Sequence, residues 1–195
     1  MTDSNNSSQS GLEPTDCGNA LFVTVMCQAD VESVSQLERR CNTLPWTPGA
    51  YSTEVRNPSA CYLVAKKNDG AIVGYAGMWI IMDEAHVTTI GVDPILRGRK
   101  VGEVLLNALM QCAVDQGAAR ATLEVRQGNI VAHRLYVKYG YQDVAMRKNY
   151  YSDNSENAII MWADDLRTEA YLSLLAKNRE RLGEFVDVNY DFSRN

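Results

Sequence analysis

Two short runs in the middle of this chain decide how its fold is interpreted: IGVDP at residues 90–94 and RGRKVG at residues 97–102. The first run ends an apolar stretch typical of a β-strand, and the second directly precedes a helical pattern. The first turn of a helix leaves backbone N–H groups unpaired, and with the positive end of the helix dipole they attract anions. Gly98 and Gly102 lack a Cβ, so the backbone can approach a diphosphate closely there. The two runs therefore predict a strand, a phosphate-binding loop and a helix in succession.

The helix after this loop is predicted to pack against a core. Its apolar side chains recur at three- and four-residue steps, at Val101, Val104, Leu105, Ala108, Leu109 and Cys112. The chain has no strand followed by G-x-G-x-x-G and no G-x-x-x-x-G-K-[ST], so neither a Rossmann enzyme nor a P-loop ATPase is expected. Taken alone, a basic turn with two glycines is also compatible with a surface turn that binds nothing.

Short apolar runs and helical patterns alternate on both sides of this segment. Strands are predicted at residues 21–27, 61–66, 71–82, 85–92, 121–125, 141–146 and 157–162. Helices are predicted at residues 31–42, 48–56, 101–117, 129–139 and 165–185. The sequence therefore predicts an α/β (α+β) fold in which a mixed sheet is flanked by helices.

Length and composition limit the possible classes of protein. The 195 residues, 46% of them hydrophobic, suffice for one well-buried core. A net charge of -5 argues against general nucleic-acid binding. The five cysteines form no C-x-x-C pair and are accompanied by only two histidines, so no metal site is expected. No run approaches the roughly 20 apolar residues that span a membrane, so no membrane partner is expected.

The first 20 residues differ in composition from the rest of the chain. They are rich in Ser, Asn, Gln and Asp, and they contain neither Lys nor Arg. This composition predicts a disordered tail at residues 1–20 rather than a secretory or organelle-targeting segment. We therefore expect a soluble, cytoplasmic protein.

Several further motifs occur in a fixed order along residues 20–163. They are LPW at 44–46, LEVR at 123–126 with Asn129, LY at 135–136, GY at 140–141, RKNYY at 147–151 and AIIM at 158–161. With the loop at 97–102, they resemble the GNAT superfamily of acyl-CoA N-acyltransferases, and within it the RimI-type ribosomal-protein alanine N-acetyltransferases. In the superfamily pattern [QR]-x-x-G-x-[GA], Arg97 and Gly102 match the outer positions, whereas Lys100 stands where the middle glycine is usual. The lysine adds a side chain where the cofactor passes, or it swings outward and pairs with phosphate.

The resemblance implies a fold, a domain organisation and a co-substrate. It implies a GNAT-like, mostly antiparallel sheet in an acetyltransferase domain at residues 21–163. A helical extension at 164–195 then follows, which compact RimI-type enzymes lack and which we expect to pack as an accessory helix. Acetyl-CoA is the implied co-substrate, without a metal. Its implied contacts are Ile90, Gly91, Val92, Arg97, Gly98, Arg99, Lys100, Val101, Gly102, Glu103 and Asn129, with the N–H of Val92 as the donor to the oxyanion.

The resemblance also implies catalytic roles for two side chains. Matched positions make Glu124 the general base, acting directly or through water, and Tyr136 the general acid. From the residues alone, Glu124 is equally a solvent-facing strand residue and Tyr136 an ordinary core tyrosine. His133 has no evident orienting partner and is interpreted as a surface or cap residue.

The expected reaction is acetyl transfer from acetyl-CoA to the N-terminal α-amine of a protein, with alanine of a ribosomal protein as the expected acceptor. Three large aromatic residues, Trp46, Tyr150 and Tyr151, are candidates for the wall that receives this N-terminus, although they could equally pack beneath loops. Two alternatives remain open. One is a lysine or small-amine acetyltransferase of the same fold, and the other is a non-catalytic acyl-CoA-binding module.

Overall fold

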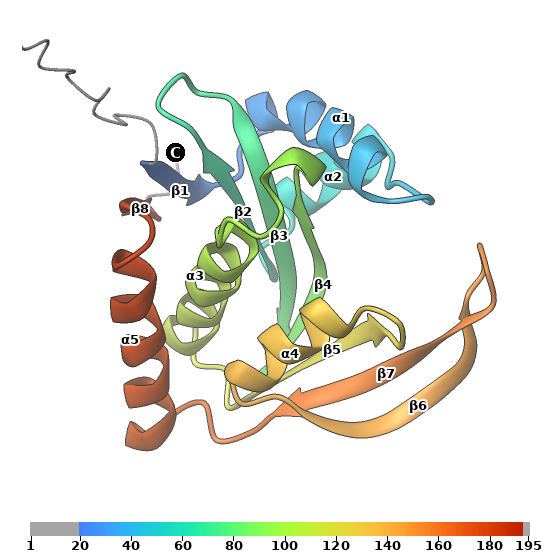
Figure 1. The fold of residues 1–195 in the computed structure, drawn as a ribbon, viewed down its shortest axis with the longest axis vertical. Coiled ribbons are helices and arrows are strands. Elements are labelled where there is room, and N and C mark those ends of the chain that lie inside the picture. Colours follow the sequence, from blue (N-terminus) through green and yellow to red (C-terminus); the bar gives the residue numbers. More distant parts are fainter. Residues whose placement is uncertain (1–19, 193–195) are drawn as a thin grey trace, which may run out of the picture.

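The computed structural model describes residues 20–192, in which eight strands form one sheet in the order β6-β7-β5-β4-β3-β2-β1-β8 (Figure 1). The strands are β1 (Leu21–Val25), β2 (Ala60–Lys66), β3 (Ile72–Ile81), β4 (Glu84–Val92), β5 (Arg120–Arg126), β6 (Gln142–Tyr151), β7 (Glu156–Ala163) and β8 (Val188–Asp191). The helices are α1 (Val31–Cys41), α2 (Pro48–Arg56), α3 (Val101–Asp115), α4 (Ile130–Lys138) and α5 (Glu169–Gly183), with 3-10 turns η1 (Gln28–Asp30) and η2 (Pro94–Leu96).

The sheet is mixed, as the sequence patterns predicted, and mostly antiparallel, as the resemblance implied. The β4–β5 and β1–β8 pairs are parallel, and the other neighbouring pairs are antiparallel. Strand β8 was not predicted, because its sequence VNYD contains two residue types that are rare in strands. It forms because the chain after α5 returns beside β1. The prediction of a disordered tail at residues 1–20 concerns residues 1–19, which lie outside the described part of the chain, and Ala20.

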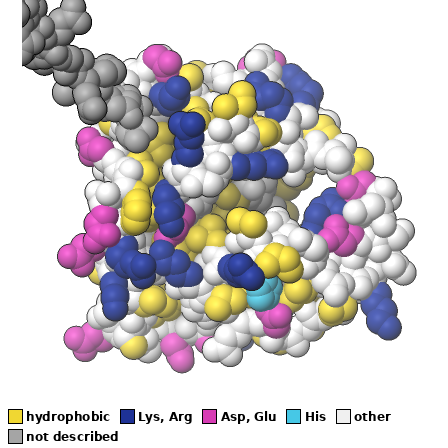
Figure 2. Space-filling view, viewed as in Figure 1, with side chains coloured by type: hydrophobic (Ala, Val, Ile, Leu, Met, Phe, Trp, Pro, Cys, Tyr) yellow, Lys and Arg dark blue, Asp and Glu magenta, His cyan; other side chains and the backbone are white. Residues whose placement is uncertain are grey.

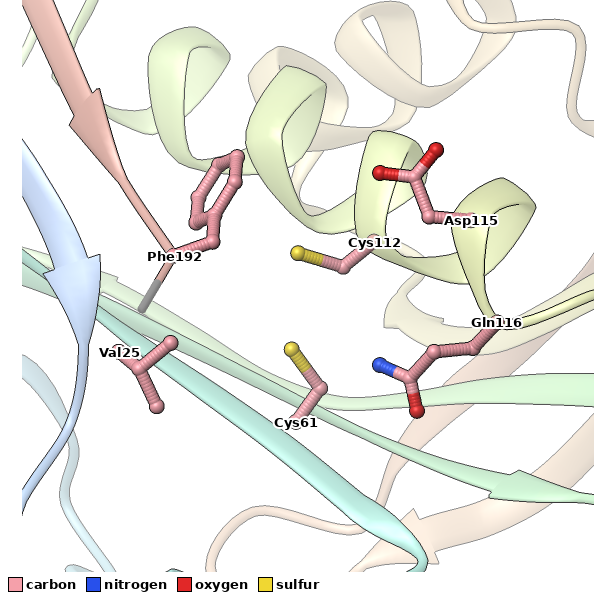
Figure 3. Close-up of a pocket in the computed structure, with 6 residues that line it drawn as sticks. All are labelled: Val25, Cys61, Cys112, Asp115, Gln116 and Phe192. Atoms are coloured by element: carbon pink, nitrogen blue, oxygen red, sulfur yellow. The ribbon is translucent and has the colours of Figure 1, made fainter. Parts of the chain in front are cut away.

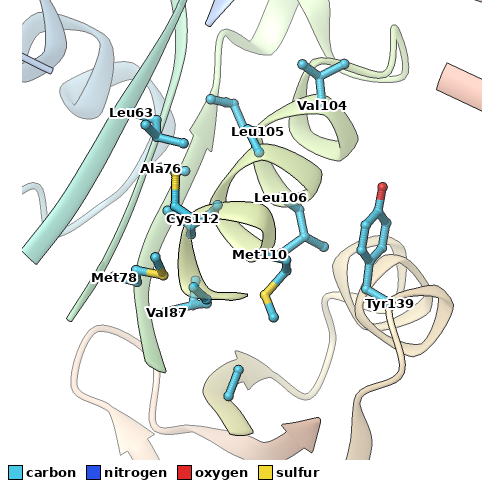
Figure 4. Close-up of a cluster of buried hydrophobic side chains, with 14 of the residues drawn as sticks. Leu63, Ala76, Met78, Val87, Val104, Leu105, Leu106, Met110, Cys112 and Tyr139 are labelled. Carbon is cyan, nitrogen blue, oxygen red and sulfur yellow. The ribbon is translucent and has the colours of Figure 1, made fainter. Parts of the chain in front are cut away.

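Each face of the sheet carries its own apolar core. One core joins α1 and α2 to the sheet and includes Val34, Leu37 and Tyr51. The other joins α3 to the sheet, and Figure 4 shows side chains of α3 such as Leu105 and Met110 among residues of β2, β3 and β4. Helix α3 is buried almost all round rather than on the single face that its periodicity predicted, since α5 covers its second side. Asn107 of α3 is accordingly buried, and its Nδ2 donates to the carbonyl oxygen of Leu175, 3.1 Å away, on α5.

A buried carboxylate joins α1 to its neighbours. Glu38 is 2% exposed, and its oxygens accept hydrogen bonds from the hydroxyls of Tyr51 on α2 (3.0 Å) and Tyr75 on β3. They also accept from the backbone N–H of Trp46 (3.3 Å) and from Nδ2 of Asn42 (3.0 Å). Burial above all, with the Glu38 carboxylate adding to it, raises the pKa of both tyrosines far above the usual value, so their hydroxyls remain donors.

The sheet opens between β4 and β5. The two strands pair only from Glu84↔Arg120 to Val87↔Leu123, although β4 continues to Val92 and β5 to Arg126. The register of β3 with β4 skips one residue at this point, so Thr88 forms a β-bulge, which bends a strand and strengthens its twist. Figure 1 shows the result, since β2–β4 run steeply while β5–β7 cross the lower part of the molecule. The gap between the two strands is where the candidate site lies.

Candidate functional site

The main cleft of the molecule begins at this gap. It has a volume of about 1070 Å³ and is lined by the end of β4, the loop before α3, the first turn of α3, the inner side of α4, the end of α1 and one residue of α5. Figure 2 shows the hollowed centre of this face with Lys and Arg side chains around it. The cleft is large enough for an extended ligand of several linked groups.

The loop before α3 presents backbone N–H groups to the cleft. The first hydrogen bond within α3 runs from the N–H of Val104 to the carbonyl of Lys100, so the N–H groups of Val101, Gly102 and Glu103 have no partner within the helix. Gly98 has a φ of +79° and Lys100 a φ of +66°, which is left-handed backbone. The left-handed conformation explains why the superfamily loop pattern has a glycine at the position of Lys100, since this conformation costs residues other than glycine about 1–2 kcal/mol. The resulting turn has the geometry that favours an anion at a helix N-terminus.

Of the residues that the structure describes, six cationic side chains and only one carboxylate line the cleft. The cations are Arg97, Lys100, Arg126, Arg134, Lys138 and Arg181, and the carboxylate is Glu103. Lys100 (3.0 Å) and Lys138 both pair with Glu103. Burial alone would raise the pKa of Glu103, but these two hydrogen bonds outweigh it and hold the pKa below its usual value. The cleft therefore has a positive excess inside a protein of net charge -5, as an anionic ligand requires.

The end of β4 points N–H groups into the gap. The N–H of Asp93 donates to the carbonyl of Val73 on β3 at 2.9 Å. Because successive N–H groups of a strand alternate in direction, those of Val92 and Ile90 point away from β3, toward the unpaired side of β4. The Sγ of Cys41 lies 3.3 Å from the carbonyl oxygen of Val92 on that same side. The Val92 N–H is thus placed to donate to a group bound in the gap.

Tyr136 and Asn129 enter the cleft from α4. Asn129 caps α4, since its side-chain oxygen accepts from the N–H of Ala132 at 3.2 Å, and it lines the cleft as well. Tyr136 packs with the α3 side of the sheet, and its ring centroid lies 5.9 Å from that of Tyr141. Burial raises the pKa of Tyr136 to about 12, so its hydroxyl is a hydrogen-bond donor at any neutral pH.

Glu124 lies on the opposite face of the sheet from Tyr136. Strand alternation buries Leu123 and Val125 in the α3 core and turns Glu124 toward the other side. Its Oε2 lies 2.8 Å from Nε2 of His86 and its Oε1 lies 3.1 Å from a guanidinium nitrogen of Arg147. The hydrogen bond with His86 is the main reason that the pKa of Glu124 is lowered, and the Arg147 charge adds to it, against a smaller opposing effect of burial. Glu124 is therefore a fixed, ionised carboxylate on the face away from Tyr136.

The hairpin of β6 and β7 reaches the α1–α2 loop on this second face. Oγ1 of Thr43 donates to Oδ2 of Asp153 at 2.6 Å, and Arg126 also pairs with Asp153 (2.9 Å). The guanidinium of Arg126 lies 3.8 Å from the ring centroid of Tyr151. The arrangement fixes Tyr151 beside the gap.

The structure places the predicted site residues in three groups. The predicted cofactor contacts line the cleft, except Arg99, which is exposed and lies outside that lining. Tyr136 shares the cleft, whereas Glu124 and Tyr151 lie near the gap without lining it. Trp46 packs against Tyr51, with ring centroids 5.5 Å apart, while Tyr150 is exposed.

Sequence reasoning missed several residues near the site. His86 and Arg147 hold Glu124, and four further cations add charge to the cleft: Arg126, Arg134, Lys138 and Arg181. Alternation alone places His86 on the face away from Ala85 and Val87, but only the pairing of β4 with β5 brings it to Glu124. The interpretation of His133 as lacking an orienting partner was wrong, because its Nε2 lies 2.7 Å from Oδ1 of Asp143.

A smaller pocket lies elsewhere, between β2 and α3. Its volume is about 140 Å³, and Figure 3 shows the side chains of Cys61 and Cys112 pointing into it beside Phe192. It shares no lining residue with the main cleft, contains no Lys or Arg, and is below the size range of ligand pockets. We therefore assign the chemistry to the main cleft.

Comparisons with known proteins agree with this geometry. The sequence model described as the Acetyltransferase (GNAT) family matches residues 31–141. A relative from Bacillus subtilis (strain 168) is 43% identical over 134 residues, 68% of this chain and 88% of the relative, and carries the name [ribosomal protein bS18]-alanine N-acetyltransferase as a provisional one. The N-alpha-acetyltransferase RimI of Mycobacterium tuberculosis is 34% identical over 148 residues, 73% of this chain and 91% of that protein.

Solved structures with similar sequences share this fold. The ribosomal-protein-S18-alanine N-acetyltransferase from Escherichia coli superposes with a TM-score of 0.69 at 27% identity, over 74% of this chain and 94% of that one. Ard1 from Thermoplasma volcanium gives a TM-score of 0.67 at 31% identity, over 74% and 97% of the two chains. Within residues 20–192 no helix combines the length and apolarity needed to cross a membrane.

Proposed function

This chain belongs to the GNAT family of acetyltransferases, and we propose that it transfers the acetyl group of acetyl-CoA to the N-terminal α-amine of a ribosomal protein that begins with alanine. The names of its relatives favour this acceptor, since relatives from several bacteria are named as bS18-alanine N-acetyltransferases. Such an acceptor would be met in the cytoplasm.

One observation carries the proposal: the two catalytic candidates lie on opposite faces of the gap between β4 and β5. Tyr136 belongs to the cationic cleft on the α3 side, and Glu124 to the face with the α1–α2 loop. A carrier bound in the cleft could thus present its reacting end in the gap, while an amine approaches from the Glu124 side. The donors and charges of the cleft fit acetyl-CoA, because a diphosphate suits the N-terminus of α3 and the surrounding cations.

Acetyl-CoA supplies the thioester carbonyl that the amine attacks. Glu124 accepts the proton that the amine nitrogen loses as the new C–N bond forms. The N–H of Val92 donates to the carbonyl oxygen while negative charge develops on it. Tyr136 donates its hydroxyl proton to sulfur as the C–S bond breaks, and both side chains then exchange protons with solvent. His86 and Arg147 keep the Glu124 carboxylate oriented, and a carboxylate has enough lone pairs to hold both and the amine.

The pH dependence of the rate should come from protonation of the acceptor amine rather than from protonation of Glu124. The His86 hydrogen bond lowers the pKa of Glu124, so the carboxylate is ionised at every pH above its usual range. An N-terminal α-amine has a pKa of about 8, so kcat/KM for the peptide should rise about tenfold per pH unit below about pH 8 and then level off. Initial rates from pH 5.5 to 9.5 measure this profile. A rise that has not levelled off by pH 9.5 would contradict an α-amine acceptor and indicate lysine, whose pKa is about 10.4.

The acceptor itself is tested by thiol release from acetyl-CoA with two peptides. One begins with a free alanine and contains no lysine, and its twin has a blocked N-terminus and one internal lysine. Transfer to the first peptide alone is the expected result, because the α-amine is partly neutral at pH 7 and lysine is not. Transfer to the lysine peptide would replace the proposal with a lysine acetyltransferase. Binding of acetyl-CoA without transfer to either peptide would contradict the proposed acceptor and favour a small amine or a non-catalytic acyl-CoA-binding module.

A further inference from the structure

The C-terminal extension brings a cation and an aromatic ring to the mouth of the main cleft. Arg181, in the last turn of α5, lines the cleft, although the family match ends at residue 141. Phe185 lies four residues later, and its ring centroid is 5.3 Å from Nζ of Lys100, another lining residue. Residues 181 and 185 lie on the same side of the helix end, because the N–H of Phe185 still donates to the carbonyl of Leu182 at 3.0 Å.

Phe185 is exposed, and the chain on either side of it is anchored. It is 59% exposed, which is unusual for a large aromatic side chain, and the neighbouring Leu182 and Val186 are both buried in the core. Strand β8 then fixes the following residues beside β1. Lys100 lies over the ring, so the rest of its exposed surface is available to a flat group. Because the backbone around Phe185 is already anchored, a ligand that stacks on the ring does not have to order this segment.

Arg181 is one of the cleft cations that remain available for a ligand. Within residues 20–192, Lys100 and Lys138 are paired with Glu103, and Arg126 with Asp153 and Glu156, whereas no ion pair engages Arg97, Arg134 or Arg181. Arg97 belongs to the loop before α3, where the diphosphate is expected. Arg181 lies farther along the chain on α5, beside the Lys100–Phe185 contact. A second phosphate group would give it a partner.

We infer that the C-terminal extension completes the site for the nucleotide end of the carrier, with Phe185 stacking on the adenine ring and Arg181 binding the ribose 3′-phosphate. The inference rests on the proposed use of acetyl-CoA. Lys100 links the loop before α3 to the C-terminal extension. It stands where the superfamily pattern has a glycine, and its Nζ contacts the ring of Phe185. The departure from the family loop and the presence of α5 are thus parts of one arrangement.

Binding measurements without any acceptor test this inference. The full chain is titrated calorimetrically with three ligands: CoA, dephospho-CoA, which lacks the 3′-phosphate, and 4′-phosphopantetheine, which also lacks the adenosine. Comparison of the three affinities separates the two subsites. Arg181→Ala should weaken CoA about 5- to 10-fold and leave dephospho-CoA unchanged. Phe185→Ala should weaken CoA and dephospho-CoA alike by about 5- to 10-fold and leave 4′-phosphopantetheine unchanged, and Phe185→Tyr should retain wild-type affinity.

The control is Lys177→Ala, which removes one exposed positive charge from α5 outside the cleft lining and should leave all three ligands unaffected. Equal affinity of the unaltered chain for CoA and dephospho-CoA would overturn the phosphate subsite. Loss of affinity for all three ligands in either variant would overturn the inference as well, because it would indicate a general disturbance of the cleft. Since no amine takes part, these results are independent of whether the proposed acceptor is right.

Discussion

Replacing Glu124 with glutamine is expected to lower kcat for an alanine-initiated peptide by about 100- to 10,000-fold, the range for loss of a general base. Glutamine has the same size and can still contact His86 and Arg147, but it cannot take a proton from the amine. The affinity for acetyl-CoA should stay the same, because Glu124 does not line the carrier cleft. Single-turnover rates together with the dissociation constant of acetyl-CoA measure both quantities.

The matched control is Glu84→Gln, the same change at a partly exposed carboxylate of β4 that pairs with Arg120. Its kcat should stay within about twofold of the unaltered enzyme, since surface ion pairs contribute little. The fold should survive Glu124→Gln, because the His86 and Arg147 side chains are 37% and 53% exposed and water can solvate them. A loss of less than about threefold in kcat would show that another group receives the proton. A parallel loss of acetyl-CoA affinity would assign Glu124 a structural role instead.

The largest effect on stability is expected at Glu38. Glu38→Ala should reduce the free energy of unfolding by about 3–5 kcal/mol, because the buried hydroxyls of Tyr51 and Tyr75 and the N–H of Trp46 lose their acceptor. A domain of this size is stable by about 5–15 kcal/mol, so the variant would be marginal. Equilibrium unfolding in urea, followed by tryptophan fluorescence, measures the change.

Two further variants separate the hydrogen-bond network from the loss of helix surface. Glu38→Gln retains one acceptor oxygen and the side-chain volume, so we expect a loss of about 1 kcal/mol. Glu32→Ala changes an exposed glutamate of the same helix and should alter stability by less than about 0.5 kcal/mol. Equal losses for Glu38→Ala and Glu32→Ala would contradict a role for the buried network.

The Glu38 network also supports β4. The Tyr75 ring packs directly on Gly91 of β4, where an added Cβ would lie 2.2 Å from ring atoms. The acceptor of the Tyr75 hydroxyl thus helps to fix the strand whose Val92 N–H faces the gap. Stability and positioning of the site therefore depend on the same buried group.

Local features of the sequence were enough to predict most of the helices and strands, and also the loop before α3 in the candidate site. The glycines, basic residues and helical pattern of residues 97–115 predicted the loop and α3, because helix ends and tight turns depend on residues close in sequence. Alternation along β5 placed Glu124 opposite Leu123 and Val125, and Asn129, the first residue of the helix predicted at 129–139, caps α4. The catalytic roles of Glu124 and Tyr136 come from the family resemblance and stay predictions.

Only the tertiary structure decided what these residues meet. The bulge at Thr88 and the early end of β4–β5 pairing open the sheet, and His86 reaches Glu124 across 38 residues of sequence. Burial of α3 on both sides, the pairing of β8 with β1 and the arrival of Arg181 at the cleft all depend on where α5 packs. By itself, the sequence determined periodicity, caps and turns, whose energies come from neighbours within a few residues. The opening of the sheet and the composition of the cleft were decided by contacts between segments far apart in the chain, which no local pattern specifies.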